Sequence, residues 1–232
     1  MYHPPSAPLV PPSGLCYANR FGLHFLLALE EVMSKNGANA TLIMSGLRQF
    51  VHQYPPDDLR RGFDIAYIAS ICQGLEDMAG RAQGRSISKR AGREMFSERL
   101  PAFYDIIPAL KMRTAASYQA LALHAQVEAA LPLLDQLIIS FDSPHRGTII
   151  EKPDHFVYTM HQCPACFGRS ADSAHSAHGG EQPMCACVSG MLDGGLKWFT
   201  GRYLEIVESQ CRAHGYTHCV FEIYGASESP AR

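Results

Sequence analysis

The sequence lacks a strong excess of charge of either sign, and this absence excludes several classes of partner. Its 232 residues carry a formal net charge of −2, with 20 Lys and Arg against 22 Asp and Glu. Proteins that bind nucleic acid or anionic membranes usually present a clear excess of positive charge. We therefore expect no nucleic-acid partner. The one basic cluster, residues 81–93, is a short run that we interpret as a solvated helix.

Long apolar runs are also missing, so we expect no membrane span. The first 14 residues contain five prolines, and they show neither the basic start nor the apolar centre of a signal peptide. These features predict a cytoplasmic protein. In that compartment cysteines remain reduced thiols, which makes disulfides an unfavourable explanation for any cysteine cluster.

The third absence concerns catalytic motifs. The sequence has no glycine-rich phosphate loop, no dinucleotide fingerprint and no nucleophile elbow. A reductase needs an electron source, and no flavin or nicotinamide motif is visible. We therefore expect a binding protein, with no catalytic residue assigned.

Cysteine, in contrast, is concentrated in the last third of the chain. Six of the eight cysteines lie between Cys163 and Cys219. They form a CPAC motif at 163–166, a CAC motif at 185–187, and the pair Cys211 and Cys219. Short cysteine spacings indicate a metal site, a disulfide set or a redox pair, and the expected reducing compartment favours the metal.

The hydrophobic pattern predicts helices first and strands later. Apolar residues recur at helical spacing up to about residue 140, in segments expected at 19–37, 41–53, 57–79, 86–99 and from 114 to 138 with a kink or break at Pro132. Strands are expected at 148–151, 156–160, 202–208 and 217–224, with one helix at 185–200. This order predicts an α+β fold in which N-terminal helices pack on an antiparallel sheet of about four strands.

The same pattern predicts the domain organisation. Residues 1–14 are expected to form a disordered, proline-rich arm. Residues 15–226 are expected to form a single domain, with a helical part at 15–143 and a metal-containing sheet part at 144–226.

The C-terminal cysteines have a spacing that local geometry can bring together. Glu208 and Cys211 lie at the end of one predicted strand, Cys219 begins the next, and Gly215 allows the turn between them to close. Structural zinc takes four ligands from thiolates, imidazoles or carboxylates. A fourth ligand must come from elsewhere, and Cys185 or Cys187 can supply it.

Two other interpretations remain open. An all-thiolate site, resembling a small zinc ribbon, would use Cys163, Cys166, Cys185 and Cys187. The two sets can share one metal or each hold their own. Alternatively, Cys211 and Cys219 are core thiols and Glu208 is a surface carboxylate.

The pattern Cys185…Gly201-Arg202…Glu208-x-x-Cys211-x3-Gly215-x3-Cys219 resembles the 4-vinyl reductase domain family. The resemblance extends upstream through Asn19-Arg20 and Pro55-Pro56-Asp57-Asp58, so it covers roughly residues 19–224. That family includes proteins of bacteriochlorophyll synthesis, hydrocarbon-binding proteins and phenol-sensor domains. The resemblance implies a zinc site at Cys185, Glu208, Cys211 and Cys219. It also implies a ligand-binding fold like that of nitric-oxide signalling and Golgi transport proteins.

The function implied by the resemblance is a zinc-stabilised domain that binds an apolar or aromatic small molecule, such as a tetrapyrrole precursor of bacteriochlorophyll that it carries or senses. Candidate ligand-binding residues are Tyr67, Tyr118, His124, Tyr158 and Trp198, each equally compatible with a core position. One alternative is a 4-vinyl reductase-type oxidoreductase or its accessory subunit. Another is a protein-interaction module, and the fold resemblance implies a homodimer.

Overall fold

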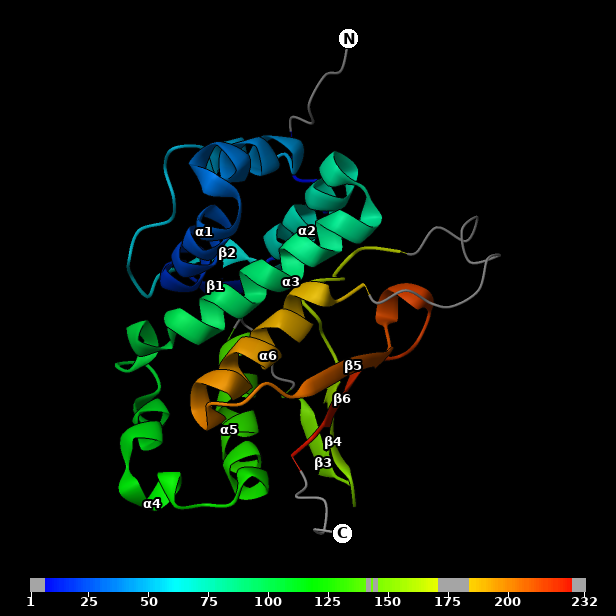
Figure 1. The fold of residues 1–232 in the computed structure, drawn as a ribbon. Helices are drawn as coiled ribbons and strands as arrows, with labels where there is room; N and C mark the ends of the chain where they lie inside the picture. The colour runs from blue at the N-terminus through cyan, green and yellow to red at the C-terminus, as the bar shows by residue number, and fades with distance from the viewer. Residues whose placement is uncertain (1–6, 141–142, 144–145, 171–183, 227–232) are drawn as a thin grey trace.

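A four-stranded antiparallel sheet lies at one side of the protein, and helices make up most of the rest (Figure 1). The computed structural model describes residues 7–140, 143, 146–170 and 184–226. The sheet has the order β3-β4-β6-β5, with β3 at Thr148–Glu151, β4 at His155–Met160, β5 at Glu205–Gln210 and β6 at Cys219–Tyr224. This architecture confirms the expected α+β class.

The two central strands of the sheet bury one face. Buried and half-buried residues alternate along β4 and β6, as expected for strands whose side chains point to opposite faces in turn. The buried face carries Phe156 and Tyr158 from β4 and Phe221 and Ile223 from β6. Helix α5, Leu123–Ile138, lies against this face. A hydrogen bond joins the two elements, since the Tyr158 hydroxyl donates to Oδ1 of Asp135 at 2.8 Å.

The remaining helices stack outward from the sheet (Figure 1). Helix α6, Ala186–Thr200, contacts α5, β5 and the long helix α3, Arg81–Glu98. Helix α3 in turn contacts α1, Asn19–Met44, and α2, Ile65–Ala79. Helix α3 is therefore the element that connects the N-terminal helices to the half of the molecule that contains the sheet.

Glycines permit the close crossing of α3 and α6. A methyl group added at Gly190 would lie 2.0 Å from the carbonyl oxygen of Lys89, and one at Gly92 would lie 2.1 Å from that of Cys187. Both distances are too short for a side-chain carbon, so glycine is required at these positions for the two helices to approach as they do.

Several helix boundaries differ from those expected. The helices expected at 19–37 and 41–53 form the single element α1, interrupted at Ser34, where φ is 67° and ψ 163°. The second ends at Met44, and the short 3-10 helix η1 follows at Arg48–Phe50. Helix α2 begins eight residues later than Asp57, because Asp64 caps it by accepting from the Ala66 amide.

A small sheet occupies part of the sequence that we expected to be helical. Strand β1, Cys16–Ala18, pairs antiparallel with β2, Arg61–Asp64. The expected break at Pro132 is also absent, because α5 runs through that residue. The interruption instead separates α5 from the one-turn helix α4, Ala116–Gln119. Besides η1, the described residues contain the 3-10 helices η2 at Leu100–Phe103, η3 at Pro108–Thr114 and η5 at Arg212–His214.

The described part of the N-terminal arm is packed on the helices instead of being disordered. Val10 is buried, and its amide donates to the Ser70 hydroxyl at 2.9 Å. The carboxylate of Asp64 accepts from the amides of Ser13 and Gly14 at 2.9 and 2.8 Å. An apolar anchor and satisfied backbone groups explain the order of residues 7–14. Residues 1–6 of the expected arm lie outside the described residues.

Candidate metal centre

The hairpin of β5 and β6 carries three potential metal ligands. Glu208 on β5 lies opposite Phe221 on β6. Cys219, the first residue of β6, pairs with Met160 on the neighbouring strand β4. The β5–β6 register shifts between Glu208 and Gln210, immediately before Cys211. Gly215, with φ of 92°, closes the turn that follows. The local geometry expected from the sequence, a strand end and a tight turn, is therefore present.

Cys185 connects this hairpin to helix α6. It occupies the N-cap position of the helix, and its amide donates to Oε2 of Glu208 at 2.8 Å. The Cys185 sulfur lies 3.5 Å from the sulfur of Cys211 and 3.7 Å from that of Cys219. Donor atoms of Cys185, Glu208 and Cys211 all lie within 4.8 Å of one another. The positive end of the α6 dipole also favours anionic ligands at this position.

The CPAC motif joins the same cluster. Cys163 and Cys166 lie in the turn after β4, and the Cys166 sulfur lies 3.4 Å from that of Cys219. The sulfurs of Cys163, Cys166, Cys185 and Cys219 all lie within 4.8 Å of one another, and all four residues are buried. The sequence offered Cys163 and Cys166 as alternative ligands that share the metal of the hairpin or hold their own, and the structure brings both to the hairpin residue Cys219.

Burial and mutual contact determine the electrostatics of the cluster. Loss of solvation raises the pKa of Cys185, and it raises the pKa of Cys163 to about 11. The pKa of Cys219 is lowered instead, because the thiols of Cys163, Cys166 and neighbouring cysteines hydrogen-bond to its thiolate. The backbone amide of Arg212, 3.4 Å from the Cys219 sulfur, can donate to the same thiolate.

Glu208 has an unsatisfied oxygen within the cluster. Its Oε1 is buried and has no hydrogen-bond partner, and loss of solvation raises the pKa of this carboxyl group. A buried carboxylate oxygen without a partner is costly unless a proton or a cation completes it. A metal ion held between Glu208 and the adjacent sulfurs satisfies this oxygen.

The donor set fits zinc. Thiolates with one carboxylate match the ligand preferences of Zn²⁺, and a tetrahedral site with Zn–S bonds of about 2.3 Å places its sulfurs about 3.8 Å apart. The observed sulfur separations of 3.4–3.7 Å are close to that value. The cysteines of the cluster are all thiols and not disulfides, so their sulfurs are available to bind a metal.

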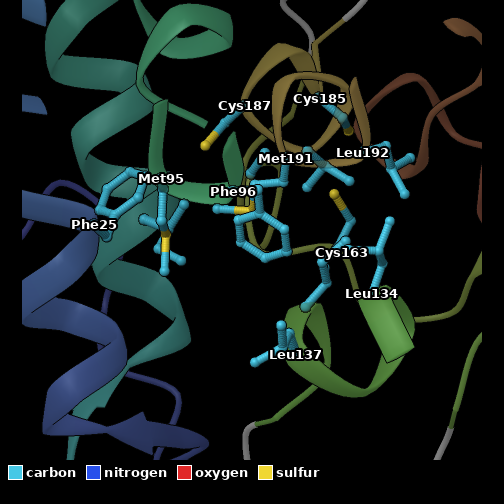
Figure 2. Packing of buried hydrophobic residues seen from close by; sticks show 14 of the residues in the cluster. Phe25, Met95, Phe96, Leu134, Leu137, Cys163, Cys185, Cys187, Met191 and Leu192 are labelled. Carbon is cyan, nitrogen blue, oxygen red and sulfur yellow. The ribbon is translucent and has the colours of Figure 1, made fainter. Parts of the chain in front are cut away.

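Cys187, an alternative ligand from the sequence, lies outside this cluster. The side chains of Cys185 and Cys187 leave the start of α6 in different directions (Figure 2). The thiol of Cys187 interacts instead with that of Cys72 on α2. One turn of helix places alternate residues on different faces, so the two cysteines of a CAC motif cannot both face the hairpin.

Of the five residues expected to bind the ligand, Tyr118 and Trp198 meet at Phe199, and the other three have different neighbours. Tyr67 packs against Phe50 and Phe63, and Tyr158, a residue of β4, is buried on the side of the sheet that faces α5. His124 is half-buried, with Nε2 3.2 Å from the Glu151 carboxylate. Tyr118 and Trp198 both contact Phe199, but the Tyr118 hydroxyl is already used, since it donates to the carbonyl of Gln126 at 3.0 Å.

Comparison with known proteins identifies the segment that contains the cluster. The model of the 4-vinyl reductase domain family matches residues 156–224, which include every cysteine of the cluster and Glu208. This match agrees with the resemblance read from the sequence pattern. No curated protein matches the chain.

The fold is similar to that of H-NOX domains. A structure solved to probe heme distortion in the H-NOX family has a TM-score of 0.50 and 13% sequence identity, covering 93% of this chain and 98% of that one. An H-NOX protein from S. oneidensis in the Fe(II)NO ligation state has a TM-score of 0.48 and 14% identity, covering 86% and 96%. At 13% sequence identity, the similarity between this chain and the first of these structures concerns the fold alone.

Proposed function

We propose that this chain is a zinc-stabilised domain that binds an apolar or aromatic small molecule. The observation that carries the proposal is that donor atoms of Cys185, Glu208 and Cys211 lie within 4.8 Å of one another and that the Cys219 sulfur lies 3.7 Å from that of Cys185. All four residues lie within the segment that matches the 4-vinyl reductase domain family. Zinc held by four protein ligands has no open position for a substrate, so its role here is structural. It links the start of α6 to the β5–β6 hairpin. The reduced thiols that it needs agree with a cytoplasmic location.

The ligand site that we propose is an open cleft between α3, α6 and β5. It has a volume of about 570 Å³, within the usual range for small-molecule sites. Its lining combines apolar side chains with both signs of charge, from Lys89, Arg93, Asp193, Tyr203, Leu204, Glu205, Ile206 and Val207. Tyr203 and Val207 are 61% and 39% exposed, so they offer apolar surface to a bound molecule.

A tetrapyrrole is the ligand class that we propose to test first. The H-NOX structure with the similar fold comes from a study of heme distortion, so in that family the fold accommodates a tetrapyrrole. In the cleft, Lys89 and Arg93 supply positive charge for carboxylate groups, although Arg93 already pairs with Asp193. The apolar residues supply the surface for a ring.

The experiment is native mass spectrometry of the purified chain, combined with titration by a divinyl tetrapyrrole. We expect about one zinc or more per chain and saturable binding of the tetrapyrrole. Tyr203→Ala and Val207→Asp should each weaken binding by roughly 10-fold or more, since they remove apolar contact area. Tyr216→Ala is the matched control, because Tyr216 is an exposed tyrosine outside the cleft. Equal affinity in all variants would reject the cleft.

Two other functions give different outcomes when NADPH is added to this mixture and the oligomeric state is recorded by native mass spectrometry. An oxidoreductase would consume NADPH and reduce the vinyl group without a partner protein. An interaction module would form a homodimer and bind no small molecule. We expect no turnover, because the sequence shows no flavin or nicotinamide motif that would supply electrons. If the chain forms a dimer, we expect that dimer to bind the ligand.

A further inference from the structure

The cluster contains more donors than one zinc ion can use. Five sulfurs and one carboxylate converge, in two overlapping groups that share Cys185. A tetrahedral ion takes four ligands. Suppose that one ion uses the four ligands of the proposed function. Cys163 and Cys166 then remain as buried thiols, in contact with the sulfurs of the cysteines that hold the ion. The Cys166 sulfur has only other cysteine sulfurs as partners among its described contacts.

Two ions use all six donors if two of the sulfurs are shared. Cys185 belongs to both groups. Cys219 belongs to the four-cysteine group, but its sulfur lies 3.7 Å from that of Cys185 and it also interacts with the thiol of Cys211, so it can serve as the second shared sulfur. The first ion is then held by these two sulfurs together with Cys163 and Cys166. The second is held by the same two sulfurs together with Glu208 and Cys211. Each ion has four ligands, and no donor is left over.

One terminal sulfur of each proposed ligand set lies in contact with a sulfur of the shared pair. The Cys166 sulfur lies 3.4 Å from that of Cys219, and the Cys211 sulfur lies 3.5 Å from that of Cys185. Oε1 of Glu208, buried and without a hydrogen-bond partner, lies on the side of Cys211 and supplies the carboxylate ligand. This arrangement matches the two ligand sets.

The charge of the site does not oppose a second ion. A single Zn²⁺ balances two of four anionic ligands and leaves Cys163 and Cys166 protonated. Two Zn²⁺ balance four of six anionic ligands, because the second ion displaces the two thiol protons. The net charge of the buried cluster is the same in both forms, so the second ion adds no charge to a region of low dielectric.

We propose that this protein holds a binuclear zinc–thiolate site in which Cys185 and Cys219 bridge the two ions. The proposal rests on the structural zinc of the proposed function and extends it. Its structural consequence is that the turn after β4 is tied to the β5–β6 hairpin and to the start of α6. All three chain segments meet at this one position.

The number of zinc ions bound per chain tests the proposal directly. The chain is reconstituted with Zn²⁺ under anaerobic, reducing conditions, and the ions are counted by native mass spectrometry and elemental analysis. We expect two zinc ions per chain in the wild type and one in Cys163→Ser/Cys166→Ser. The matched control is Cys72→Ser, a buried cysteine outside the cluster, which should keep two. One zinc in the wild type overturns the binuclear site and leaves the proposed function intact. No bound zinc overturns both, and iron with acid-labile sulfide overturns the assignment of zinc.

A second measurement needs only the wild-type protein, in case the double variant does not fold. After exchange with ¹¹³Cd²⁺, the binuclear site gives two NMR resonances, one from an ion with four sulfurs and one from an ion with three sulfurs and an oxygen. Coupling between the two resonances, transmitted through the shared sulfurs, establishes the bridge. A single resonance, or two without coupling, rejects the bridged arrangement.

Discussion

At the scale of single residues, Asp135 is the buried acid that holds α5 against the sheet. Its Oδ1 accepts from the Tyr158 hydroxyl at 2.8 Å and from the Gly147 amide at 3.0 Å. Loss of solvation nevertheless raises the pKa of the carboxyl group, because desolvation outweighs these two hydrogen bonds. The charged form is therefore less favourable in the folded state than in the unfolded chain.

This shift predicts how stability responds to pH. Since the folded-state pKa of Asp135 lies above the unfolded value, the contribution of this group to the free energy of unfolding is present at low pH. It is lost as pH rises through the folded-state pKa. Asp135→Asn keeps the acceptor oxygen without the charge. We expect it to be at least as stable as the wild type at neutral pH, with an advantage that shrinks as the solution is acidified.

Denaturant titrations of both proteins between about pH 4 and 7 measure this difference. Loss of metal at low pH destabilises the wild type and Asp135→Asn alike, so it cancels in the difference between their free energies of unfolding. Asp135→Ala is the contrasting variant, since it leaves the buried Tyr158 hydroxyl without an acceptor and should cost about 1–3 kcal/mol. If the free energy of unfolding depends on pH in the same way for the wild type and Asp135→Asn, the raised pKa of Asp135 is contradicted.

At the scale of elements, the crossing of α3 and α6 depends on glycine. Gly190 and Gly194 face the backbone of α3, where added methyl groups would lie 2.0 and 2.3 Å from the carbonyl oxygens of Lys89 and Arg93. Gly92 makes the reciprocal approach from α3 to the Cys187 carbonyl. The crossing also sets the position of Cys185, because that residue caps α6.

Gly190→Ala should therefore destabilise the fold although alanine is the better helix former. The propensity gain of roughly 1 kcal/mol is smaller than the strain of separating two packed backbones, so we expect a net loss of about 1–3 kcal/mol. Arg90→Ala, at an exposed position of α3, should change stability by less than about 0.5 kcal/mol. Chemical denaturation measures both, and a stabilised Gly190→Ala would show that the helices can separate freely.

At the scale of the whole molecule, the candidate metal centre is built from segments that are far apart in the sequence. The turn after β4, the start of α6 and the β5–β6 hairpin meet there, while α1 and α2 pack at the opposite side of α3 (Figure 1). Removing metal should therefore loosen the sheet half more than the N-terminal helices.

Chelation under reducing conditions tests this expectation. A ligand present at about 1,000 times its Kd stabilises the folded state by about 4 kcal/mol, which for a chain of this size corresponds to a fall in Tm of roughly 10 °C on removal. Hydrogen exchange should accelerate first in β5 and β6 and last in α2. Cys211→Ser should show a much smaller response to chelator. Uniform acceleration over all helices and strands would contradict a local role.

Several features of this protein could be predicted from its sequence because they depend on residues near one another in the chain. Alternating apolar residues predicted β4 and β6, and the spacing of Glu208, Cys211 and Cys219 predicted that they share a hairpin. The helices at 41–53 and 57–79 were placed less well, because apolar spacing does not reveal a strand such as β2 or the capping of α2 by Asp64.

The sequence by itself determined the fold class, the late strands and the meeting of Glu208, Cys211 and Cys219 in one hairpin, since each follows from local spacing and from the alternation of apolar residues. Only the tertiary structure decided that Cys163 and Cys166 join Cys185 and Cys219, and that Cys187 turns toward Cys72. The physical reason is that spacing along a chain constrains neighbours within a turn or a hairpin. The meeting of a turn, a helix start and a hairpin depends instead on how α6 packs between α3 and the sheet.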